Sequence, residues 1–175
     1  LSSAASDVYK RQDIFNIIKQ HGLTVEYIIL THGHGDHICR VPEIKSKTNA
    51  KIVAHVNEEE VLIDRNKNLS AQLPGPLVEF DADEYVQEGD VIELGSLKLK
   101  VIHTPGHTKG GMCIKVGEHI FTGDTLFAGS IGRTDFYGGD YKQIMKSLRK
   151  LAKYDDNAVI YLSLIHISEP TRLGM

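Results

Sequence analysis

A seven-residue run, THGHGDH at residues 31–37, places three histidines and one aspartate within six positions. Imidazole and carboxylate groups are the usual protein ligands of zinc and similar divalent ions. The apolar residues 28–30 that precede the run are typical of the end of a buried strand, where ligands can be aimed with little freedom. Gly33 and Gly35 are expected to let the backbone fold tightly, so that alternate side chains converge. The run therefore predicts a metal site.

The number of ligand-type side chains in this run predicts two metal ions. An open catalytic zinc takes three protein ligands and a water, so four candidates exceed what one ion needs. His32 and His34 could serve one ion, and Asp36 and His37 could serve the other. The alternative is a polar surface loop that happens to be rich in histidine.

Two further candidate ligands also stand at predicted strand ends. His107 follows Pro105-Gly106 after a predicted strand, and Asp124 follows a glycine after another. A carboxylate at such a position could bridge two cations. We expect His103 to have a supporting role behind a ligand, and His55 to reach solvent. Three separate strand ends could thus meet at one edge of a sheet sandwich.

The rest of the chain alternates between helical and strand-like patterns. Apolar residues at helical spacing predict a helix over 13–20, and Asp140 can cap another helix that carries an apolar stripe. Two hairpins with two-residue turns are predicted over 91–103 and 112–122. This order is typical of an α/β layer arrangement. Further strands are expected at 25–30, 51–55 and 157–161, short helices at 41–47 and from Asn57, and a loop at 66–80.

Composition excludes several classes of protein. A length of 175 residues suits one domain. The formal net charge is −3 and the basic residues are not clustered, which argues against a nucleic-acid-binding face. No apolar run is long enough to cross a membrane. The two cysteines, Cys39 and Cys113, make no disulfide framework, so we expect a cytoplasmic setting. Both cysteines are expected to be buried.

Both ends of the chain resemble translated cloning linker. These ends are residues 1–12 (LSSAASDVYKRQ) and 162–175 (LSLIHISEPTRLGM), and such segments are set aside in fold reasoning. The native domain is then expected to span 13–161. His166 lies in the second linker-like segment and is not counted as a ligand.

Three segments resemble a known superfamily. Residues 31–37 resemble the T-H-x-H-x-D-H signature of the metallo-β-lactamase fold, and residues 104–108 resemble its P-G-H-T segment. Residues 121–135 (FTGDTLFAGSIGRTD) resemble the segment with the bridging aspartate in the glyoxalase II (hydroxyacylglutathione hydrolase) branch. The resemblance implies an αββα sandwich, here truncated at both ends. It also implies a ligand set: His32, His34 and His107 for one metal, Asp36 and His37 for the other, and Asp124 between them.

The chain departs from this family in three places. The family's opening strands are absent before Asp13. Its last metal histidine would follow Tyr161, where the linker-like tail begins. Cys39-Arg40 replaces the small residues that are common after the motif. We therefore expect the chain to be a fragment of a longer parent.

The resemblance implies a metal-dependent hydrolase, and most simply a thioesterase acting on a small-molecule thioester. Two divalent ions, zinc or else iron or manganese, would lie about 3.5–4 Å apart and hold a bridging hydroxide. Asp36 would act catalytically by orienting that hydroxide. Arg133 is a candidate for binding a substrate carboxylate, and the alternative is a solvated arginine.

Two other functions remain open. Residues 132–136 (GRTDF) also resemble the persulfide dioxygenases of the superfamily, which use a single iron. The counterparts of His32, His107 and Asp124 would then form a facial triad of two histidines and one carboxylate. A non-catalytic binding protein, or an inactive fragment on the same fold, is the other alternative.

Overall fold

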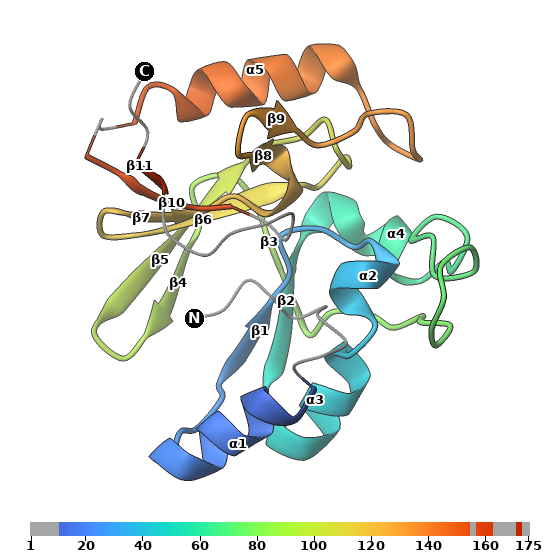
Figure 1. Ribbon diagram of the computed structural model, residues 1–175, viewed down its shortest axis with the longest axis vertical. Helices are drawn as coiled ribbons and strands as arrows, with labels where there is room; N and C mark the ends of the chain where they lie inside the picture. Colours follow the sequence, from blue (N-terminus) through green and yellow to red (C-terminus); the bar gives the residue numbers. More distant parts are fainter. Residues whose placement is uncertain (1–10, 155–156, 163–170, 173–175) are drawn as a thin grey trace.

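Two main β-sheets face each other, and helices cover their outer faces (Figure 1). The computed structural model describes residues 11–154, 157–162 and 171–172. The first sheet has three parallel strands in the order β1 (Tyr27–Ile29), β2 (Lys51–His55) and β3 (Glu84–Val86). The second sheet is mixed and has six strands, in the order β11 (Thr171–Arg172), β10 (Val159–Tyr161), β7 (His119–Phe121), β6 (Met112–Val116), β5 (Leu97–His103) and β4 (Val91–Leu94).

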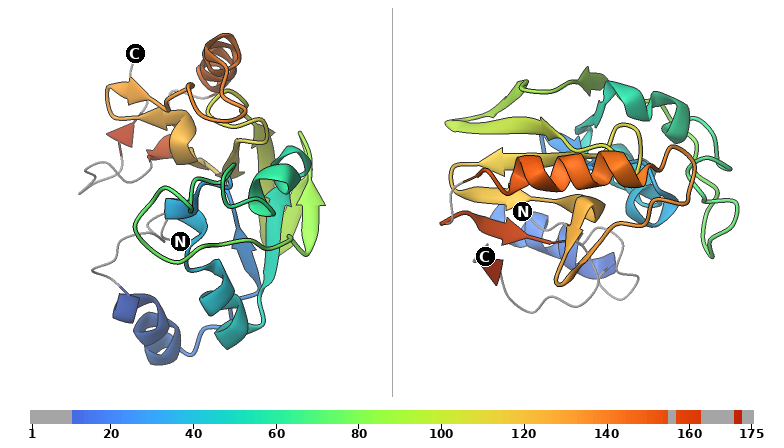
Figure 2. Two further views of the ribbon diagram at one scale, coloured as in Figure 1. Left: turned by 90° about the vertical axis from the view of Figure 1, so that its right-hand side faces the viewer. Right: turned by 90° about the horizontal axis from the view of Figure 1, so that it is seen from above.

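The helices lie outside this pair of sheets. Helix α5 (Tyr141–Leu151) lies over the second sheet, while α1 (Arg11–His21) and α3 (Val41–Thr48) lie beyond the first (Figure 2). A short hairpin of β8 (Leu126–Phe127) and β9 (Ser130–Ile131) connects β7 to α5. The helical elements are α1 (Arg11–His21), α2 (Gly35–Ile38), α3 (Val41–Thr48), η2 (Val56–Glu58), α4 (Glu59–Leu62), η3 (Gly123–Thr125) and α5 (Tyr141–Leu151).

Three apolar clusters hold together four layers, which are helices, the first sheet, the second sheet and α5. In β2, Ile52 and Ala54 pack against α2, α3 and α4, whereas Val53 between them faces the second sheet. In β5, Val101 faces the first sheet, whereas Ile102 packs toward α5. Because successive strand side chains point to opposite faces, each buried strand contributes to two clusters. The αββα sandwich expected from the sequence is confirmed.

Most of the predicted elements form where the patterns place them. The strand at 51–55 and the two hairpins are present, and Asp140 caps α5 by accepting a hydrogen bond from the Gln143 amide at 2.9 Å. Strand β3 was not predicted, because its polar sequence depends on parallel pairing with β2. Cys113 is fully buried as expected, Cys39 is half-buried, and the two form no disulfide.

Large parts of the two linker-like segments lie outside the described residues, His166 among them. Within these segments, α1 begins at Arg11 and Thr171–Arg172 pairs antiparallel with β10. Leu162 belongs to the apolar cluster under α5. The proposed domain limits at 13 and 161 stay a prediction. None of the helices in the described ranges is long and apolar enough to span a membrane.

Candidate metal centre

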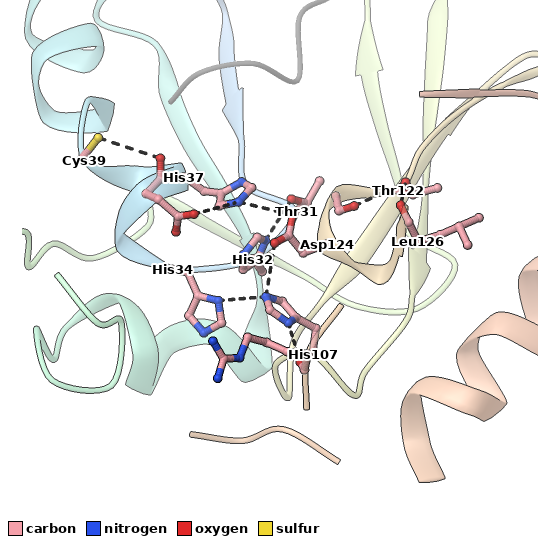
Figure 3. A network of polar contacts seen from close by, with 12 residues as sticks. Thr31, His32, His34, His37, Cys39, His107, Thr122, Asp124 and Leu126 are labelled. Carbon is pink, nitrogen blue, oxygen red and sulfur yellow. Dashed lines mark hydrogen bonds and ion pairs between the residues drawn. The ribbon is translucent and has the colours of Figure 1, made fainter. Parts of the chain in front are cut away.

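Three strand ends meet at one edge of the sandwich and bring the candidate ligands together (Figure 3). The 31–37 run follows β1, His107 follows β5, and Asp124 follows β7 inside η3. In Figure 3 the four histidines 32, 34, 37 and 107 and the Asp124 carboxylate point toward one another. The convergence expected from strand-end placement is therefore present.

The ligand atoms form two groups that share His32. One nitrogen each from His32, His34 and His107 lie within 4.8 Å of one another, and so do atoms of His32, His37 and Asp124. Asp124 faces both groups, because its Oδ1 is 3.3 Å from His37 Nε2 and its Oδ2 is 3.6 Å from His107 Nε2. The Asp124 carboxylate therefore lies between the two groups.

Asp36 lies at the margin of the second group. Its Oδ2 is 3.6 Å from His37 Nε2, its side chain is 55% exposed, and it belongs to neither close group. The reason is local: His34 precedes α2 with an extended backbone, and residues 35–38 turn helical. Asp36 and His37 therefore project from a helix rather than from an open loop.

Gly33 and Gly35 are needed for close approach. Neither has a positive φ angle, so what these two glycines contribute is the lack of a side chain. A Cβ at Gly33 would lie 2.9 Å from Glu58 Oε2, and one at Gly35 would lie 3.0 Å from the Ser70 backbone. Other chain segments pack directly onto the ligand run, and any side chain at these two positions would displace them.

Burial keeps the first group of histidines neutral. Burial lowers the pKa of His32 well below its ordinary value and that of His34 to about 3, with neighbouring histidines adding to both shifts. Burial also lowers the pKa of His107, whose Nδ1 lies 2.8 Å from the Arg133 carbonyl oxygen. That carbonyl can only accept, so Nδ1 carries the hydrogen and Nε2 presents a lone pair. Neutral imidazole is the form that binds metals.

His37 behaves differently. Burial acts to lower its pKa, but the hydrogen bond and the charge of Asp124 raise it above the ordinary value. The Asp124 carboxylate therefore favours the protonated form of His37. The second group is consequently more polar than the first.

The residues fit a cation. The Nε2 atoms of His32 and His34 are buried and have no hydrogen-bond partner within the described part of the chain. A buried polar atom without a partner costs about 1–3 kcal/mol. Two such nitrogens beside a carboxylate are the donor set of a divalent metal site.

Glu58 is an important residue that sequence reasoning missed. It is fully buried, and its two carboxylate oxygens accept hydrogen bonds from Gly33 N at 2.8 Å, Gly110 N at 2.8 Å and Thr108 Oγ1 at 2.5 Å. Burial raises its pKa, and the three hydrogen bonds oppose that shift. Glu58 therefore ties the 31–37 run to the loop of His107. The signal available in the sequence was the position of Glu58 just after the predicted strand at 51–55.

His55 is not at the surface, so that expectation is wrong. It is 2% exposed, and its ring stacks on His103 with centroids 3.9 Å apart. Its Nδ1 accepts a hydrogen bond from the Asn57 amide, so His55 caps the following turn. His103 lies 2.9 Å from the Lys109 carbonyl oxygen and outside both ligand groups. Its contact supports the loop that carries His107.

A cleft with a volume of about 600 Å³ opens beside the two groups. His34, His107 and Asp124 form part of its lining. Arg133 also lines it, with the guanidinium 3.9 Å above the Phe136 ring and 2.6 Å from the Asp135 carboxylate. The candidate substrate-binding arginine is thus placed at the cleft but is already paired.

Comparison with known proteins agrees with this geometry. The family model described as the metallo-beta-lactamase superfamily matches residues 5–163. The chain belongs to this superfamily. Membership supports a hydrolase-type enzyme that binds divalent metal.

Superfamily relatives give a more detailed context. A probable metallo-hydrolase of Bacillus subtilis, YqgX, is 36% identical over 136 residues, which cover 76% of this chain and 64% of that protein. The chain therefore spans less than two thirds of this relative. The hydroxyacylglutathione hydrolase GloC of Haemophilus influenzae is 32% identical over 148 residues, covering 82% and 70%. The crystal structure of the BLEG-1 B3 metallo-beta-lactamase matches with a TM-score of 0.84 at 27% identity, covering 97% and 81%.

Proposed function

We propose that the chain is the catalytic part of a metal-dependent thioester hydrolase of the glyoxalase II type. The observation that carries the proposal is the Asp124 carboxylate, which faces His37 with one oxygen and His107 with the other. A carboxylate between two ligand groups suits a two-metal hydrolytic site. The similarity to GloC and the glyoxalase II-like sequence of residues 121–135 favour a thioester as the substrate.

His32, His34 and His107 would hold the first ion, Asp36 and His37 would hold the second, and Asp124 would bridge them. Bound divalent ions supply a water of lowered pKa and a Lewis acid for the carbonyl oxygen. Zinc suits this donor set, and iron or manganese are alternatives.

The side chains then position the reactants. Asp36, exposed at the cleft beside His37, orients the attacking water and accepts its proton. The water oxygen bonds to the acyl carbon, the C–S bond breaks, and the sulfur keeps the bonding electrons. A thiol has a pKa of about 8.5, so it leaves as thiolate without a dedicated acid. Arg133 would pair with a substrate carboxylate in exchange for Asp135.

The test is metal analysis with a thioester assay on the purified chain. We expect two metal equivalents and cleavage of an acyl-thioester that stops when a chelator removes the metal. Metal-loaded chain without any thioesterase activity would contradict the proposal.

A second candidate is a mono-iron persulfide dioxygenase. His32, His107 and Asp124 lie close enough for a facial triad, since the His107 and Asp124 side chains approach to 3.6 Å and the His32 and His107 ring centroids are 4.8 Å apart. One iron per chain with oxygen uptake on glutathione persulfide would favour this function. Two metals with thioester cleavage would favour the hydrolase.

A further inference from the structure

Leu69, one of the residues that line the cleft, has an unusual backbone conformation. Its φ angle is +67°, and the other non-glycine residue with positive φ in the described ranges is Asn49, which ends a helix. Asparagine tolerates this left-handed region, whereas a branched apolar residue there is a genuine outlier. Such strain persists only where the surroundings enforce it.

Buried hydrogen bonds enforce this conformation. The Asn68 side chain donates to the Val78 carbonyl at 2.7 Å and accepts the Ser70 amide at 2.9 Å. The Asn68 carbonyl accepts the Gly35 amide at 2.6 Å, which ties the segment to the 31–37 run. The Leu69 carbonyl accepts from Leu73 N at 3.1 Å. The position of Leu69 is therefore coupled to that of the candidate ligands.

Leu69 and Leu73 line the cleft, as His34 does. Phe127 and Ile131 of the β8–β9 hairpin and Phe136 also line it. Leu73 is 39% exposed, so part of this apolar surface is open to an incoming molecule. Glycine or asparagine at position 69 would hold the same backbone with less strain. The feature that leucine adds is its apolar side chain.

We propose that Leu69 is a specificity-determining residue and that the substrate carries an apolar acyl group beside the scissile carbonyl. This inference rests on the proposed thioesterase function. A substrate whose carbonyl lies at the ligand cluster would place its neighbouring group against the Leu69 and Leu73 side chains. Each methylene buried in such a pocket changes kcat/KM roughly fourfold.

The first test compares Leu69→Gly and Leu69→Asn with the unaltered chain. Both replacements tolerate positive φ. The assay measures kcat/KM for thioesters of one thiol with acetyl, butyryl and octanoyl groups. We expect the unaltered chain to prefer octanoyl, and both variants to lose roughly tenfold or more of that preference. Metal content should be unchanged, and the melting temperature of Leu69→Gly should not fall.

The matched control is Leu77→Asn. Leu77 is 59% exposed in the same loop and does not line the cleft. It should keep the acyl-length profile of the unaltered chain. An unaltered chain without any preference for octanoyl, or variants that retain the full preference with normal metal content, would overturn the inference.

A binding measurement separates this inference from the proposed function. Calorimetry with octanoate and acetate on the metal-loaded chain needs no turnover. We expect octanoate to bind more tightly than acetate, and Leu69→Asn to remove most of the difference. Failure of thioester cleavage with this binding pattern intact would reject the thioesterase and keep the apolar subsite. Equal binding of the two carboxylates to the unaltered chain would reject the subsite.

Discussion

The two halves of the candidate metal centre differ in how firmly the fold holds them. His32, His34 and His107 are 2%, 4% and 4% exposed, and Glu58 ties together the two loops that carry them. Asp36, in the other half, has a side chain that is 55% exposed and projects from the four-residue helix α2. Ligands whose rotamers are fixed by packing lose less entropy on binding. One short run of sequence therefore supplies both a preorganised half and an open half.

The largest effect is expected at His32, because it belongs to both groups. His32→Ala should reduce the affinity for both ions and lower thioesterase activity by more than about 100-fold, since loss of even a supporting partner costs 10–100-fold. Metal analysis and initial rates measure this. His119→Ala, at an exposed strand residue, is the control and should behave as the unaltered chain. Full retention of either ion by His32→Ala would show that His32 does not support both halves.

Glu58→Gln tests what holds the buried half. The carboxylate accepts three donors, so an amide NH₂ would face an N–H or O–H group and leave it unsatisfied, at a cost of about 1–3 kcal/mol. We expect lower unfolding free energy and roughly 10–100-fold weaker first-metal binding. Denaturant unfolding of the metal-free chain and metal titration measure these effects. Glu59→Gln, an exposed neighbour, is the control. If Glu58→Gln bound the first metal as tightly as the unaltered chain, Glu58 would not be what holds the buried half in place.

Asp36→Asn probes the open half. We expect weaker binding of the second ion and a lower thioesterase rate, with the first ion unaffected, because Asp36 contacts His37 and lies outside the buried group. The expected loss, in affinity for the second ion and in thioesterase rate, is roughly 10–100-fold. If the variant lost the first ion as well, the division into two halves would be wrong.

The smallest expected effect concerns the buried His55 and the stability of the chain in acid. Burial and the stacked His103 lower the pKa of His55 to about 4, while Glu88 and Asp90 oppose the shift. In the unfolded chain His55 takes up its proton near pH 6.5, whereas in the folded chain it stays neutral until about pH 4. The stability that depends on neutral His55 is therefore fully present above pH 6.5 and is lost as the pH falls from 6.5 toward 4. In chelator, His55→Gln should therefore show a shallower loss of stability between pH 6.5 and 4. An unchanged slope would mean that His55 does not titrate in this window.

Local patterns were sufficient to predict much of the fold. Strand 51–55 and the Asp140 cap depend on neighbouring residues and on face alternation, which a single sequence displays. The strand ends of the 31–37 run, His107 and Asp124 also predicted the convergence of the ligands.

What sequence reasoning missed depends on contacts between distant segments. Glu58 has its partners about fifty positions away at Thr108 and Gly110. His55 was expected to reach solvent, but its ring is buried because His103, on the other sheet, stacks on it. The positive φ of Leu69 is enforced by hydrogen bonds to Val78 and to the ligand run. No local pattern contains this information.

The most direct test of the central claim is a cobalt(II) titration of the metal-free chain, followed by visible absorption. We predict two steps of unequal affinity. His34→Ala should weaken the tighter step, and Asp36→Asn should weaken only the looser one. Two equal steps in the unaltered chain, or loss of the tighter step in Asp36→Asn, would contradict a buried first site beside an open second one.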